Sequence, residues 1–118
     1  MKRILLFGGL ALVAPPALAH HSFAMYDVSK TETISGTVQQ FRWSNPHVVI
    51  VVATAGPAPQ TWSVELTSPG NLRRVGWTRH SLTPGQSVSL EIYPLRDGSH
   101  GGGYQSGHLA DGTSLGPP

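Results

Sequence analysis

The chain has no cysteine among its 118 residues. It therefore forms no disulfide, carries no thiol nucleophile and offers no cysteine for lipid attachment. No apolar run reaches the roughly 20 residues that a membrane-spanning helix needs. The sequence also lacks a G-x-S-x-G motif, a suggestive pair of carboxylates and a phosphate-cradling loop. It therefore gives little support for an enzymatic function.

A strong net charge is missing too, once the leader described next is set apart. The full chain has eight Lys and Arg against six Asp and Glu. Lys2 and Arg3 belong to the leader, which leaves six charges of each sign in the rest of the chain. A neutral domain has no broad electrostatic footprint for nucleic acid, so we expect no nucleic-acid partner.

The N-terminus has the layout of a secretory signal peptide. Lys2 and Arg3 form a basic region, Ile4–Val13 is apolar, and Ala17-Leu18-Ala19 is a small-x-small cleavage site. The sequence therefore predicts cleavage after Ala19. We expect an exported, soluble protein with no membrane insertion after cleavage, which in a Gram-negative cell means a periplasmic one.

The rest of the chain is rich in strand-forming segments separated by turns. Gly36 lies within the first of these segments and predicts a bulge or bend, by which one long strand serves two faces of a barrel. The glycine-rich stretch 96–103 predicts a loop. Ser68-Pro69 is typical of a helix start and Gly76 of a helix end, so a short helix is expected between them. Strands are expected over 31–43, 47–53, 61–66, 87–93 and 104–109.

Three strands, a short helix and two further strands make an all-β chain with one short helix. This order is that of an OB-like five-stranded Greek-key barrel. We expect a signal peptide over 1–19, an N-terminal arm over 20–30 and one barrel domain over 31–115.

The same segments resemble a family of small exported bacterial proteins of unknown function. In that family HHSF opens the mature chain, and NPH and GWTR are internal motifs. The resemblance covers residues 20–112 and implies a periplasmic OB-like domain, with no established activity. It rests on HHSFAMYD (20–27), FRWSNPHVVI (41–50), SPGNLRRVGWTRHSLTPG (68–85) and PLRDGSHGG (94–102).

Histidine is the main candidate for chemistry. Cleavage after Ala19 would give His20 a free α-amine beside its ring, which together chelate a transition metal. A third nitrogen would complete a histidine brace, and nitrogen-rich sites favour Cu(II). Cleavage one residue earlier would give Ala-His-His, an amino-terminal Cu(II) or Ni(II) motif, and the alternative to both is a solvated terminus. The third nitrogen would come from His21, His47, His100 or His108.

His47 also has a structural interpretation, in which its ring bonds a backbone carbonyl and orders the preceding turn. Arg73, Arg74 and Arg79, with Trp77 between them, could bind an anionic ligand or a partner's carboxylates, or form a solvated face. Aromatic residues could form a ligand-stacking platform or pack in the core. These are Phe41, Trp43, Trp62 and Trp77.

Two functions follow from these residues. The first is a non-catalytic binding domain that takes an unknown small ligand or periplasmic protein at its barrel rim and the loop 94–103. The second is a protein that binds or handles copper, with His20, His21 and His47 as metal ligands; copper redox activity is the one catalysis left open. The candidate ligand-binding residues of the first function are Arg73, Arg74, Trp77, Arg79 and His100.

Overall fold

The computed structural model describes residues 23–118. The predicted signal peptide, its cleavage site, His20 and His21 lie outside this range. Within the range, no helix is both long and apolar enough to cross a membrane.

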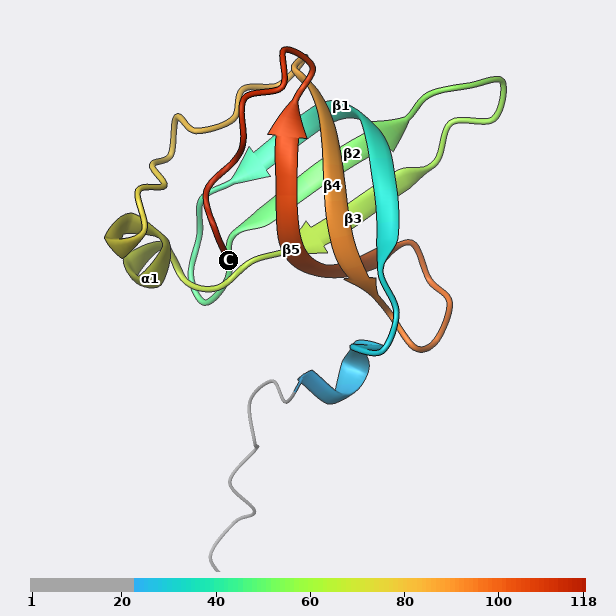
Figure 1. Ribbon diagram of the computed structural model, residues 1–118, viewed down its shortest axis with the longest axis horizontal. Coiled ribbons are helices and arrows are strands. Elements are labelled where there is room, and N and C mark those ends of the chain that lie inside the picture. The colour runs from blue at the N-terminus through green and yellow to red at the C-terminus, as the bar shows by residue number, and fades with distance from the viewer. Residues whose placement is uncertain (1–22) are drawn as a thin grey trace, which may run out of the picture.

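The described residues form five strands and one α-helix, in the order that the sequence predicts. The strands close into a barrel in the order β1-β2-β3-β5-β4, with β1 completing the ring against β4 (Figure 1). The all-β class with one short helix and the five-stranded barrel are therefore confirmed. The elements are η1 (Phe23–Met25), β1 (Glu32–Arg42), β2 (Val49–Thr54), β3 (Thr61–Glu65), α1 (Pro69–Arg74), β4 (Ser87–Pro94) and β5 (Gly101–Leu109).

β1 serves two neighbours, as its length predicts. Its first half, Glu32–Thr37, pairs with β4, and Gly36–Arg42 pairs with β2. At Gly36 both neighbours are present, and a Cβ there would collide with the carbonyl oxygen of Ala53. The register shift against β2 falls after Val38, so the bulge lies beyond Gly36 and not at it. The glycine is needed for the close approach of two strands.

Alternating side chains of the strands fill the barrel. The alternation of apolar and polar residues over 61–66 predicts inward side chains for Trp62, Val64 and Leu66, and all three are buried. In β4 the buried side chains also alternate, at Val88, Leu90 and Ile92. Burying a side chain of this size contributes about 1.5–3 kcal/mol, so these strands supply much of the stability of a chain without disulfides.

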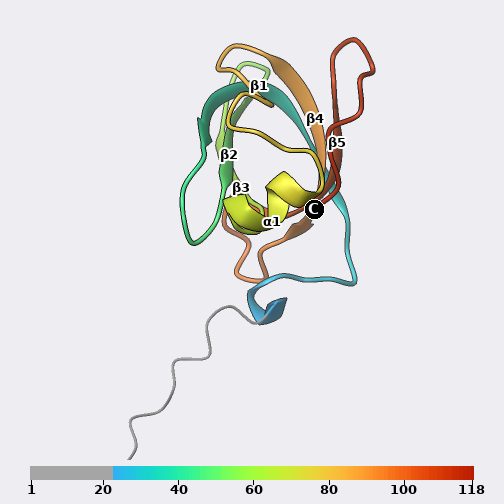
Figure 2. The same ribbon diagram turned by 90° about the vertical axis from the view of Figure 1, so that its left-hand side faces the viewer.

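α1 starts and stops where the sequence indicates. The Ser68 hydroxyl accepts a hydrogen bond from the Asn71 N–H at 3.2 Å, and proline occupies the first turn. Gly76 follows with a positive φ of 96°. The helix buries Pro69 and Leu72 and lies across one end of the barrel (Figure 2).

β5 begins earlier than predicted, because Gly101–Gly103 belong to the strand and not to a loop. These residues pair in parallel with β3 and antiparallel with β4. A Cβ at Gly102 would collide with the carbonyl oxygen of Tyr93. The glycines therefore allow three strands to approach closely. In sequence, such a glycine run cannot be distinguished from that of a flexible loop.

The C-terminal segment closes the α1 end of the barrel. The Tyr104 hydroxyl donates to the Gly116 carbonyl, and the Trp77 indole N–H donates to the Pro117 carbonyl, both at 2.8 Å. The Trp77 and Tyr104 rings meet edge to face, with centroids 5.6 Å apart. We call Trp77, Tyr104 and residues 115–117 the sealed end.

The four aromatic residues considered for a ligand-stacking platform pack in or against the core instead. Trp62 and Trp77 belong to the core. Phe41 and Trp43 are partly buried and pack against it.

Candidate functional site

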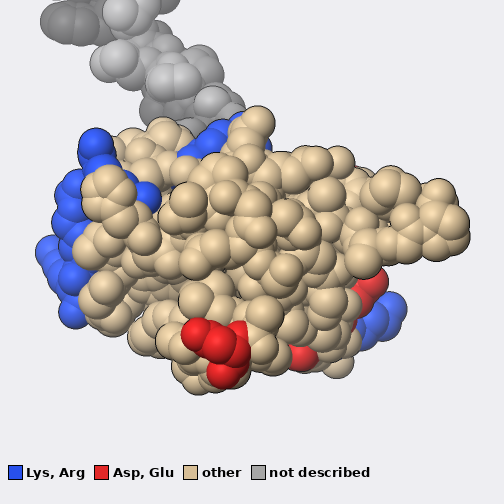
Figure 3. Space-filling model, turned by 90° about the horizontal axis from the view of Figure 1, so that it is seen from above, with Lys and Arg blue, Asp and Glu red and all other residues tan. Residues whose placement is uncertain are grey.

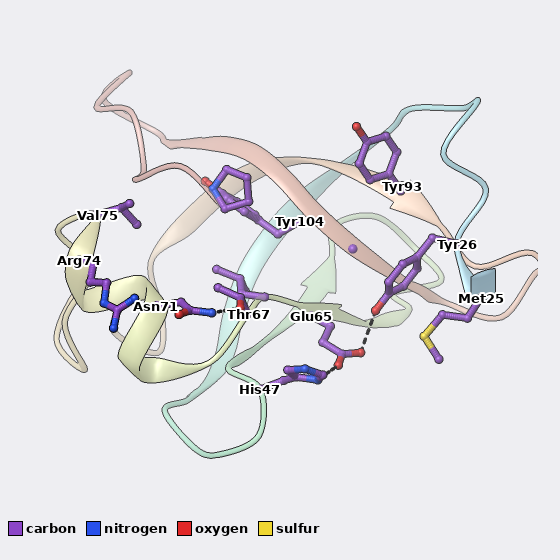
Figure 4. Close-up of a pocket in the computed structure, with 13 residues that line it drawn as sticks. Met25, Tyr26, His47, Glu65, Thr67, Asn71, Arg74, Val75, Tyr93 and Tyr104 are labelled. Atoms are coloured by element: carbon purple, nitrogen blue, oxygen red, sulfur yellow. Dashed lines mark hydrogen bonds and ion pairs between the residues drawn. The ribbon is translucent and has the colours of Figure 1, made fainter. Parts of the chain in front are cut away.

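A cavity of about 670 Å³ lies between α1, the end of β3, β5 and the N-terminal arm. It forms where β3 and β5 part. Their pairing ends at Glu65 and Gly103, and the next residues on each chain, Leu66 and Tyr104, line the cavity (Figure 4). The opening is thus a gap in the barrel wall, and α1 and the arm stand at its two sides.

A chain of polar contacts lies along one wall. The Tyr26 hydroxyl donates to Oε2 of Glu65 at 2.8 Å, while Nδ1 of His47 pairs with Oε1 of the same carboxylate (Figure 4). Burial, the hydrogen bond to Glu65 and the charge of that carboxylate raise the pKa of Tyr26 above its usual range. Both oxygens of Glu65 therefore hold protein partners.

The N-terminal arm is tied to the loop before β5, which positions Tyr26. The Arg96 backbone N–H donates to the Met25 carbonyl at 2.9 Å, and Tyr26 forms a β-bridge with Leu95. The Tyr26 ring lies over Gly103, where a Cβ would be 3.3 Å from its Cε2 atom. The loop before β5 thus holds the arm in place, and Met25 and Tyr26 of the arm line the cavity beside Gly103.

The hairpin of β2 and β3 brings His47 to Glu65. Val49 pairs with Glu65, so His47, two residues before Val49 on its chain, lies a diagonal step from Glu65. The alternation over 61–66 predicts that Glu65 points outward on its strand, and no sequence motif gives it a role. The hairpin register was the signal that could have joined it to His47. No sequence pattern identifies Tyr26, Tyr93 or Tyr104 as cavity residues.

The α1 side of the cavity carries Thr67, Asn71, Arg74 and Val75. The Asn71 amide donates to the Thr67 hydroxyl oxygen at 2.9 Å. Within residues 23–118, no carboxylate lies within 4 Å of the Arg74 guanidinium. Arg74 and Val75 lie on one side in Figure 4, and Met25 and Tyr26 on the other.

The structure separates the predicted basic-aromatic group. Arg74 lines the cavity, whereas the Arg73 guanidinium carbon lies 5.7 Å from the centroid of the Trp43 ring. Trp77 is only 2% exposed, so its indole is not available to a ligand at the surface, because it packs in the sealed end. Arg79 is exposed, and basic side chains gather at the α1 end of the face shown in Figure 3.

His100 lies away from this cavity. Its ring stacks on Trp62 with centroids 4.8 Å apart. His108 is exposed on β5. Within the described range no group of three or more His, Asp or Glu side chains could hold a metal ion. The predicted ligands His20 and His21 lie outside that range, so the copper site stays a prediction.

Fold and cavity together define a small OB-like barrel domain with an opening between β3 and β5. The family model described as "Family of unknown function (DUF6152)" matches residues 9–105, and the chain belongs to this family. No curated protein matches the chain.

Among solved structures, the chain is similar to the mitochondrial single-stranded DNA binding protein Rim1 from S. cerevisiae. The TM-score is 0.53 at 9% identity, over 69% of this chain and 93% of that one. At this identity the likeness shows the OB-like fold alone. Because that protein binds single-stranded DNA, the likeness lends no support to our expectation of no nucleic-acid partner, which stays a prediction.

Proposed function

We propose that this chain is an exported, non-catalytic binding domain that holds a small molecule in the cavity between β3 and β5. One observation carries the proposal. The large hydrophobic side chains that the described residues expose are Met25, Val28 and Val75, and Met25 and Val75 line this cavity at 45% and 42% exposure. Apolar side chains gathered in a concave site are typical of ligand recognition.

The size and lining of the cavity support the same function. Ligand pockets typically enclose about 300–1,000 Å³, with mainly apolar walls and a few placed polar groups. Leu66, Tyr104 and Val75 supply apolar surface here, and Glu65 and Arg74 add a carboxylate and a guanidinium side chain. A small molecule with an apolar body suits this arrangement.

An uncharged apolar dye, N-phenyl-1-naphthylamine, tests the cavity. We expect its fluorescence to rise on binding to the full mature protein. The double variant Met25→Ser/Val75→Ser should weaken dye binding by about tenfold, because two apolar walls are lost. Val28→Ser, which removes an equally exposed side chain outside the cavity, should leave binding unchanged. Equal weakening by both variants, or no dye binding at all, would contradict the proposal.

Export is the second part of the proposed function, and the leader supports it. Mass spectrometry of the protein from fractionated Gram-negative cells tests both compartment and cleavage. We expect a periplasmic chain that begins at His20. A full-length cytoplasmic chain would contradict this expectation.

Copper binding is a second candidate, favoured by the contact between His47 and Glu65. Metal-ligating histidines commonly pair their other ring nitrogen with a carboxylate, which orients the ring. His20, His21 and His47 would supply the ligands. Cu(II) titration of protein that begins at His20 should show higher affinity than titration of a version with an extra N-terminal Gly-Ser. Equal affinities would contradict a site that uses the α-amine.

A further inference from the structure

Two charged side chains of the cavity, Glu65 and Arg74, differ in their pairing. Glu65 uses one carboxylate oxygen for Tyr26 and the other for His47. Arg74 has no carboxylate within 4 Å among residues 23–118. The Arg74 guanidinium is therefore open to a ligand, whereas each oxygen of Glu65 already contacts a side chain of the protein.

A second donor lies on the same side as Arg74. The Thr67 hydroxyl oxygen accepts from the Asn71 amide at 2.9 Å, so its own hydrogen is free to point elsewhere. No acceptor for this hydrogen is found in the described part of the chain. A guanidinium and a hydroxyl donor that line one cavity match the two oxygens of a carboxylate.

Charge around the cavity favours the same ligand. Arg73 and Arg74 both lie in the last turn of α1, and basic side chains cover this end of the face in Figure 3. An anion is therefore attracted to the α1 side over distances of about 10 Å at moderate salt.

The apolar lining sets the rest of the ligand. Val75 stands beside Arg74, and Met25 lies across the cavity near Tyr26 (Figure 4). Leu66 and Tyr104 add to the apolar lining of the same cavity. A body that touches both exposed side chains must be extended and apolar.

We propose that the cavity binds an organic monoanion, with a carboxylate at Arg74 and an extended apolar body that reaches Met25. This ligand class rests on the proposed binding function. Thr67 supplies a hydrogen bond to the carboxylate, and Tyr26, fixed by Glu65, forms the far wall.

Three probes with the same ten-carbon chain and different headgroups test this ligand class. Decanoate, 1-decanol and decyltrimethylammonium are each titrated against the full mature protein loaded with N-phenyl-1-naphthylamine, below their aggregation concentrations. We expect decanoate to displace the dye at the lowest concentration and the cation at the highest. Equal displacement by all three would overturn the anion assignment and leave the cavity itself supported. Failure of the dye and of every probe to bind would overturn the proposed binding function as well.

Neighbouring arginines on α1 provide the matched variants. Arg74→Gln should weaken decanoate binding by about tenfold, since a charge-assisted hydrogen bond is lost, and should leave decanol binding unchanged. Arg73→Gln removes the same charge from the same helix, but its side chain lies over Trp43 and not in the cavity lining. It should alter decanoate affinity by no more than about twofold, because exposed charges are screened by salt. Thermal unfolding checks that both variants fold. Similar losses in the two variants would show general attraction by the basic end and overturn the assigned contact at Arg74.

Discussion

The sealed end and the cavity are neighbouring regions with opposite chemistry. At the sealed end, Trp77 is almost fully buried and its indole N–H is bonded to the chain. In the cavity, Val75 and Met25 expose apolar surface, and Arg74 has no carboxylate partner within the described residues. Tyr104 belongs to both, with its hydroxyl in the sealed end and its side chain in the cavity wall. This small domain therefore keeps the side chains that stabilise the fold apart from the side chains that are exposed for binding.

The largest expected effect tests the stabilising role of the sealed end. Trp77→Ala should lower the free energy of unfolding by about 3–5 kcal/mol, because it removes a buried ring and leaves a hole. Trp77→Phe, which keeps an aromatic ring, should cost less. Urea unfolding followed by circular dichroism measures both. A loss below about 1 kcal/mol for Trp77→Ala would refute the role assigned to this region.

A smaller loss is expected where β5 approaches its neighbours. Gly102→Ala places a methyl group against the Tyr93 carbonyl and 2.7 Å from Cδ1 of Ile92. We expect it to cost about 1–3 kcal/mol in unfolding free energy. Gly70→Ala is the control, since its nearest atom would be 3.9 Å away and alanine favours the helix. Equal stability of the two variants would contradict the close approach.

On the cavity side, removing one hydroxyl should cost less again. Tyr26→Phe keeps the ring over Gly103 but removes the hydrogen-bond donor to Glu65. We expect it to lower the free energy of unfolding by about 1 kcal/mol. Tyr93→Phe serves as the control, since no hydrogen bond from its hydroxyl is found in the described chain. Equal losses in the two variants would show that the contact with Glu65 is not stabilising.

At alkaline pH the two regions should respond together, with no effect near neutrality. Burial raises the pKa of Tyr104, and burial with the Glu65 contact raises that of Tyr26. Since both folded-state values exceed the ordinary value of 10, this stabilisation is complete below about pH 10 and is lost as pH rises above it. Absorbance at 295 nm should show the Tyr26 and Tyr104 side chains ionising only well above pH 10. Titration of these two side chains near pH 10 would contradict their burial.

The sequence predicted the architecture well because its signals are local. Alternation in Trp62–Leu66, the Ser68-Pro69 start and the Gly76 stop each depend on a few neighbouring residues. The start of β5 was missed, because glycines that permit close strand packing read the same as glycines of a loop. A glycine run in a strand can be distinguished from one in a loop only when the neighbouring strands are known, here β3 and β4.

The candidate site was predicted only in part. His47 and Arg74 were identified as candidates, and both line the cavity. Tyr26 and Glu65 were not, since their contact joins positions 39 residues apart through the closure of the barrel. Trp77 was grouped with the arginines beside it in sequence, but the C-terminal segment covers it. Contacts of this range depend on the assembled fold.

The short parallel pairing of β3 with β5 has a consequence for dynamics. β1 is held along both edges at Gly36 and Thr37, whereas the seam between β3 and β5 is joined only from Ser63 to Glu65. Local opening of a native protein starts where the fewest backbone bonds must break. Breathing of this seam would widen the cavity without unfolding the barrel. The rate at which amides near the seam exchange with solvent would then give a lower limit for the rate at which the seam opens, and so for how often a ligand could pass through it.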